Sequence, residues 1–88
     1  MHKPQDELVN KLEQAKEAVA VGGVYQHYKQ PDKSYKVLHL AITESDDELC
    51  VIYQAQYEER LIFVRPLKSW LDKVNYNGNL INRFTRLA

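Results

Sequence analysis

The chain has 88 residues, a formal net charge of +0 and a charged fraction of 27%, which suit one soluble globular domain. It has no apolar run of about 18 residues, so no membrane-spanning helix is expected, and its first residues lack the apolar stretch of a secretory signal. Because the net charge of the chain is zero, its long-range electrostatic attraction to nucleic acid is expected to be weak. We therefore expect a cytoplasmic protein with no membrane partner and with a buried, reduced Cys50.

Residues 1–22 are predicted to form an amphipathic helix that extends a separate domain. Pro4 suits the first helical turn, and Gly22-Gly23 is expected to end the helix because glycine adopts the left-handed conformation of a C-cap. Apolar side chains recur at spacings of three and four residues and form one stripe: Leu8, Leu12, Ala15 and Val19. This stripe must pack on the rest of the chain or on a second copy.

Residues 23–88 are predicted to form a small β domain. The pattern changes to period two, and runs rich in β-branched and aromatic residues alternate with short polar links. The predicted strands are residues 24–29, 34–43, 48–57 and 60–67. Links this short imply a meander of antiparallel neighbours. Because the strands are apolar on both faces, we expect an α+β, mainly β fold with a strongly bent sheet, an SH3-like small barrel.

The end of the chain is predicted to add a helical turn and a hairpin. Pro66 cannot donate to a ladder, so it marks the end of the fourth strand or an edge. Ser69 is the expected cap of one helical turn. Asn77-Gly78 is a strong turn signal, and it predicts a hairpin between residues 73–76 and 80–84.

The chemistry-bearing residues do not match a known metal or catalytic pattern. The histidines lie on separate elements without the spacing of a zinc motif, and no glycine-rich loop precedes a helix. We therefore expect no metal and no cofactor. No nucleophile–base pair and no pair of carboxylates is evident, so we assign no catalytic residue and do not favour an enzyme.

Arg65 is the most unusual of the charged residues. It lies in an apolar run, "FVRPL", and an arginine in such a setting usually has a carboxylate partner. Glu48 and Asp72 are the candidate partners. A structural ion pair and a ligand site both remain open for Arg65 at this point.

These stretches together resemble a bacterial family known as domain of unknown function 1653. The resemblance rests on Tyr25 through Lys29, on Val64 through Leu67 and on Arg83-Phe84, and it covers about residues 23–84. It implies no activity. Polar residues that define the pattern are expected to share a ligand site or a structural network, and in this chain they are His27, Tyr28, Lys29, Glu48, Tyr53, Arg65 and Arg83.

Three functions are compatible with these residues. The favoured one is a module that binds an anionic small molecule, a peptide or, as a minority reading, a nucleic acid. The second is an adaptor or homodimer that acts through the helix, and the third is an enzyme using His27, Glu48 and Arg65. We predict that His27 and Arg65 line one solvent-accessible concave surface, with Glu48 or Tyr53 beside them, and that the nearby positive charge lowers the pKa of His27.

Overall fold

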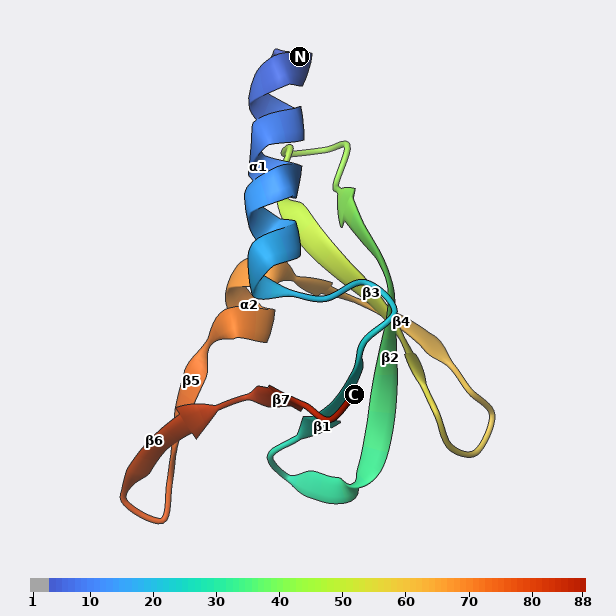
Figure 1. Cartoon of the computed structure of the whole chain (residues 1–88), viewed down its shortest axis with the longest axis vertical. Coiled ribbons are helices and arrows are strands. Elements are labelled where there is room, and N and C mark those ends of the chain that lie inside the picture. Colours follow the sequence, from blue (N-terminus) through green and yellow to red (C-terminus); the bar gives the residue numbers. More distant parts are fainter. Residues whose placement is uncertain (1–3) are drawn as a thin grey trace.

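The computed structural model describes residues 4–88, so the first three residues of the predicted helical extension lie outside it. A helix is followed by a sheet of short antiparallel strands (Figure 1). The elements in chain order are α1 (Gln5–Ala18), β1 (Val24–His27), β2 (Gln30–Ile42), β3 (Leu49–Ala55), β4 (Ile62–Pro66), α2 (Leu67–Leu71), β5 (Lys73–Tyr76), β6 (Asn79–Asn82) and β7 (Phe84–Arg86). No helix within residues 4–88 is long and apolar enough to cross a membrane.

The main sheet has the strand order β4-β3-β2-β1-β7. Its first four strands are the predicted meander, and the α+β, mainly β class is confirmed. Because β4 and β7 are the two edges, the sheet is not closed into a barrel. Register irregularities in β1 and β2 mark bulges, and bulges bend a sheet. The hairpin of β5 and β6 projects from the sheet beside β7 (Figure 1).

Four aromatic side chains and three valines form the core of the domain. Val37 and Val51 are fully buried, and Trp70 stacks on Phe84 with ring centres 3.7 Å apart. Burying such side chains is the main favourable contribution to folding. The cluster consists of Val19, Tyr25, Val37, Val51, Tyr53, Trp70 and Phe84. Because Val19 follows α1 directly, the end of the predicted extension contributes to this core.

The ends of α1 and α2 differ from the sequence prediction. The helix α1 ends at Ala18 and Val19 is already extended, whereas the glycine with positive φ, Gly22 at 85°, comes later and turns the chain towards β1. The helix α2 begins at Leu67, so Ser69 lies inside it and its hydroxyl does not cap the start of the helix. The glycines do mark a chain reversal, but they do not cap α1. Ser69 does lie in a helical turn, but it does not begin that turn.

Two strand assignments also change. The predicted link at residues 30–33 belongs to β2, because His27 pairs with Gln30 and leaves Tyr28 and Lys29 as the turn. The last predicted strand divides into β6 and the separate strand β7, which pairs with β1. The hairpin turn is confirmed, since Asn77 and Gly78 have φ values of 53° and 82°, as a type I′ turn requires.

Candidate functional site

An open hollow of about 230 Å³ lies over the sheet and contains residues from both sequence motifs. His27 comes from the end of β1, and Arg65 from β4. Among the residues that the structure describes, none of those lining the hollow is acidic. The lining residues are His27, Lys29, Gln30, Tyr35, Tyr53, Arg65 and Phe84. We call this the His27–Arg65 hollow.

The His27 ring is held in one orientation. It packs edge-on against Phe84, with ring centres 5.0 Å apart, and its Nδ1 accepts a hydrogen bond from the backbone N–H of Lys29 at 3.2 Å. In a neutral imidazole whose Nδ1 accepts, the proton is on Nε2, so this nitrogen is a donor. Burial lowers the pKa of His27 below its usual 6.5, and the positive charges of Arg65, Arg83 and Lys29 lower it further. His27 is therefore neutral at neutral pH, in agreement with the prediction.

The lowered pKa of His27 predicts a pH dependence of stability. The unfolded chain binds more protons than the folded one between the folded pKa and 6.5, so the free energy of unfolding rises with pH across this window and falls as pH drops below 6.5. Urea unfolding at about pH 7 and about pH 5.5 measures the slope. The variant His27→Gln should lose part of it, whereas His39→Gln, at an exposed position, should not. Equal slopes in all three proteins would contradict the assignment.

Arg65 has no carboxylate partner among residues 4–88, so the expected ion pair with Glu48 or Asp72 is wrong. Its Nη1 donates to the Ser69 hydroxyl at 2.8 Å, and its guanidinium carbon lies 5.3 Å from the centre of the Phe84 ring. Its Nε is buried and has no hydrogen-bond partner. A buried donor without a partner lowers the stability of the fold, and Arg83 has the same feature at its own Nε.

Aromatic rings form the apolar part of the hollow. Tyr35, Tyr53 and Phe84 meet edge to face, with ring centres 5.6 to 6.2 Å apart. The Tyr35 hydroxyl shares a hydrogen bond of 2.6 Å with the Tyr57 hydroxyl. Burial raises the pKa of Tyr35, and this bond raises it further, so Tyr35 stays a neutral phenol. The hollow thus combines positive groups with flat, uncharged walls.

Three of the residues predicted from the sequence lie outside the hollow. Glu48 lines a different groove beside α1. The Tyr28 ring belongs to the β1–β2 turn and packs edge-on against Tyr76. Arg83 lies 3.9 Å from a carboxylate oxygen of Asp72, and its buried Nε has no partner. Arg83 acts on the site at longer range, because its charge lowers the pKa of His27.

The sequence analysis missed three lining residues, Gln30, Tyr35 and Phe84. Phe84 belongs to a quoted motif and Tyr35 to a predicted strand, but a strand pattern gives no reason to distinguish an aromatic residue of a site from one of the core. Gln30 was placed in a link, so its position opposite His27 was not foreseen. Tyr28 and Lys29, which form the turn, are not typical turn residues, so nothing in the sequence signalled the pairing of His27 with Gln30.

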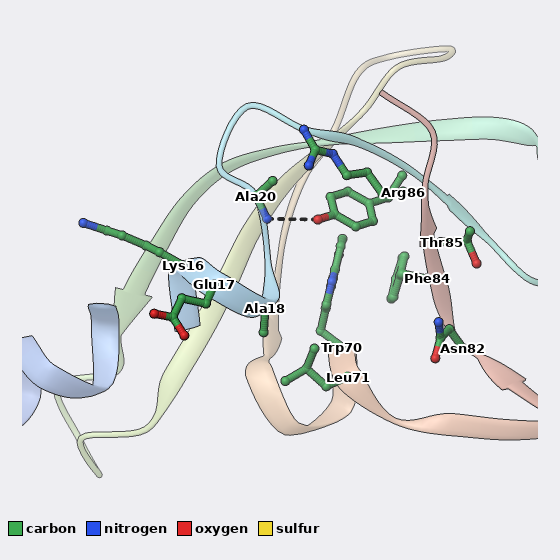
Figure 2. A pocket seen from close by; sticks show the side chains of 11 residues that line it. Lys16, Glu17, Ala18, Ala20, Trp70, Leu71, Asn82, Phe84, Thr85 and Arg86 are labelled. Atoms are coloured by element: carbon green, nitrogen blue, oxygen red, sulfur yellow. Dashed lines mark hydrogen bonds between the residues drawn. The ribbon is translucent and has the colours of Figure 1, made fainter. Parts of the chain in front are cut away.

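A second hollow, of about 360 Å³, lies between the end of α1, the helix α2 and the strand β7 (Figure 2). Trp70 and Phe84 form one side of it, and the Tyr25 hydroxyl accepts a hydrogen bond from the backbone N–H of Ala20 at 2.9 Å. Lys16 and Arg86 bring positive charge to its rim. Neither of the two buried arginine nitrogens without a partner belongs to its lining, so this hollow gives a weaker indication of a ligand than the first.

Two further kinds of site can be checked in the structure, a reactive cysteine and a metal site. Cys50 is buried as expected, and its sulfur lies 2.8 Å from the Thr43 hydroxyl. Within residues 4–88, no three His, Cys, Asp or Glu side chains are grouped so as to hold a metal ion.

The comparisons with known proteins agree with the fold and supply no activity. The family model for proteins of unknown function DUF1653 matches residues 23–86. The crystal structure of a DUF1653 protein from Bordetella bronchiseptica is similar, with 31% identity and a TM-score of 0.66 over 75% of this chain and 85% of that one. No curated protein matches the chain. The match spans all the strands and the whole His27–Arg65 hollow, and the chain therefore belongs to the DUF1653 family of proteins of unknown function.

Proposed function

We propose that this domain binds a small anionic ligand, through its carboxylate or phosphate group, in the His27–Arg65 hollow. The observation that supports this most directly is a lining that brings His27, Lys29 and Arg65 together without an acidic side chain. An arginine uses two parallel N–H groups to bind a carboxylate or phosphate, and Ser69 occupies only one nitrogen of this guanidinium. An anion in the hollow would lie beside the Arg65 guanidinium and would meet no acidic side chain in the lining.

The other lining groups suit the same ligand. The Nε2–H of His27 is a neutral donor, and Lys29 adds a positive charge at the exposed rim. Phe84 and Tyr53 offer flat surfaces on which a planar group can stack. A volume of about 230 Å³ fits a small molecule or the end of a larger one. The ligand is therefore a compact anion that carries a planar or apolar body.

The alternative functions have less support. The proposed enzyme needed Glu48 beside His27 and Arg65, and Glu48 lines another groove. A nucleic-acid strand would need a basic track along which its backbone could run. Among the residues lining the hollow, the charged groups converge at one point instead. An adaptor acting through α1 has less apolar surface to offer, because Ala15 and Val19 of the stripe are buried against the rest of the chain.

Arg65 is the residue whose replacement should matter most for binding. In an NMR titration with sulfate, and separately with benzoate, the Nε–H signal of Arg65 should shift as the ligand is added. We expect Arg65→Gln to weaken binding about ten- to a hundredfold, because a hydrogen bond to a charged group contributes about 1.5–3 kcal/mol. Arg65→Lys should restore little, since lysine lacks the planar pair of donors.

Two controls separate this site from general charge effects. Arg60→Gln removes an exposed arginine outside the hollow, and it should leave the affinity unchanged within about twofold. A single-stranded oligonucleotide tests the nucleic-acid alternative, whose binding should weaken steeply with salt. The proposal is wrong if neither small anion moves the Arg65 signal, or if Arg60→Gln and Arg65→Gln weaken binding equally.

A further inference from the structure

Three cations surround the His27 ring. Lys29 and Arg65 line the His27–Arg65 hollow together with His27, and they come from the turn after β1 and from β4. Arg83 is the third cation, although it does not line the hollow. Burial lowers the pKa of His27, and the charges of these three side chains lower it further, so each of them lies within electrostatic reach of the ring.

The pairing of β1 with β7 fixes Arg83 beside the hollow. Phe84 pairs with His27 across these two strands, and Arg83 is the residue before Phe84. The backbone N–H of Tyr28 donates to the carbonyl of Arg83 at 3.1 Å, so Arg83 is held next to the turn that carries Lys29. The side chain of Arg83 is only 25% exposed, and a partly buried charge is screened less by water and salt than an exposed one.

The positive charge around the hollow is only partly balanced. Within the part of the chain that the structure describes, neither Lys29 nor Arg65 has a carboxylate at ion-pair distance, whereas Arg83 has Asp72 at 3.9 Å. The Asp72 side chain is 61% exposed, so solvent weakens this pair. Three cations and one carboxylate leave a net charge of +2 beside the neutral ring of His27.

We propose that the ligand of the His27–Arg65 hollow is a small phosphate monoester that binds as a dianion. This inference rests on the anion site proposed above and names the class of its ligand. A phosphate monoester carries close to two negative charges at neutral pH, whereas a carboxylate or a phosphodiester carries one. Of these groups, the dianion is the one that balances the net charge around the hollow. The internal phosphates of a nucleic acid are diesters, so the same argument disfavours a strand.

The donors of the hollow also suit a group with three terminal oxygens. The guanidinium of Arg65, the Nε2–H of His27 and the ammonium of Lys29 come from β4, from β1 and from the turn after β1. A phosphate monoester offers three acceptor oxygens that point in different directions, whereas a carboxylate offers two in one plane. Arg83 contributes its charge and does not need to touch the ligand.

Two ligands of nearly the same shape separate the effect of charge from that of size. Phenyl phosphate and phenyl sulfate both carry a tetrahedral group on a planar ring, but at about pH 7.5 the phosphate is mostly a dianion and the sulfate is a monoanion. In titrations followed at the Arg65 Nε–H signal, phenyl phosphate should bind the native chain about tenfold more tightly at low salt. Arg83→Gln should remove most of this preference, whereas Arg83→Lys keeps the charge and should keep the preference.

Two further variants make the result independent of how well Arg83→Gln folds, which circular dichroism checks. Asp72→Asn removes the opposing carboxylate and should raise the preference for phenyl phosphate about two- to threefold. Arg86→Gln is the matched control, because Arg86 is an exposed arginine of β7 outside the lining of the hollow. It should leave the preference unchanged within about twofold.

The outcomes distinguish this inference from the proposed anion site. If neither ligand moves the Arg65 signal, the site itself is wrong and the inference falls with it. If both ligands bind the native chain with equal affinity, the anion site stands and the assignment to phosphate monoesters is overturned. The assignment is also overturned if Arg83→Gln changes the preference no more than Arg86→Gln does, or if Asp72→Asn lowers the preference.

Discussion

Replacing Trp70 with alanine is expected to lower the free energy of unfolding by about 3–5 kcal/mol. Trp70 is 3% exposed, it stacks on Phe84, and its ring also meets Tyr25 and Tyr53 at 5.3 and 5.0 Å. The substitution therefore leaves a cavity bounded by rigid rings, which cannot collapse into it. A domain of this length has about 4–13 kcal/mol of stability in total, so Trp70→Ala should be close to unfolding.

The loss of stability in Trp70→Ala can be measured by urea unfolding, with Leu71→Ala as the control. Trp70 is the sole tryptophan, so urea unfolding must be followed by circular dichroism rather than by tryptophan fluorescence. Leu71→Ala changes the next residue of α2, which is 46% exposed, and it should cost about 1 kcal/mol or less. Trp70→Phe keeps an aromatic ring against Phe84 and should recover part of the loss. If Trp70→Ala and Leu71→Ala cost the same, the stacked pair is not the centre of the core.

The strand pattern could be predicted from the sequence because local rules and tertiary packing agree in β3. Alternate residues of this strand are buried, including Val51, Tyr53 and Ala55, as period-two alternation requires. The hairpin at Asn77-Gly78 was predictable for a similar reason, because its geometry depends on two adjacent residues. Where the conformation is decided within a few residues, the sequence is sufficient.

Other features depend on contacts between distant residues. Residues 30–33 contain Pro31 and Asp32, which favour a turn, yet they belong to β2 because His27 pairs with Gln30. The strand β7 has three residues, and it exists because β1 offers an edge for Phe84 to Arg86. Neither pairing has a signal within its own segment, since both are set by how the sheet is assembled.

The candidate site was partly predictable. His27 and Arg65 share a hollow although two strands, β2 and β3, lie between β1 and β4, and the sequence motifs marked both residues. Glu48 could not be placed in the same way. It lies just before β3, where the chain leaves a loop, and it lines the groove beside α1 and α2. Residues inside strands are placed by register, whereas a residue at a loop end has no such constraint.

Removing residues 1–20 is expected to leave a folded sheet that is less stable by roughly 3–4 kcal/mol. The family match begins at residue 23, so the sheet should form without the helix. The deletion nevertheless removes Val19, which is fully buried, and Ala15, which is 4% exposed. Burial of these side chains contributes roughly 2–3 kcal/mol, and the lost hydrogen bond from Ala20 to the Tyr25 hydroxyl adds about 1 kcal/mol. Circular dichroism should show a β-type spectrum with a lower urea midpoint.

A shorter deletion separates the helix from its last residues. Removing residues 1–14 keeps Ala15, Val19 and Ala20, and it should cost much less than removing residues 1–20. If both truncated chains lose the same stability, the body of α1 supports the sheet rather than its buried end. Complete loss of the β-type spectrum after removal of residues 1–20 would show instead that the helix is required for folding. The expected order, with the shorter deletion close to the full chain, would show that the stabilising contribution of the N-terminal segment comes from residues 15–20, although the sheet folds without them.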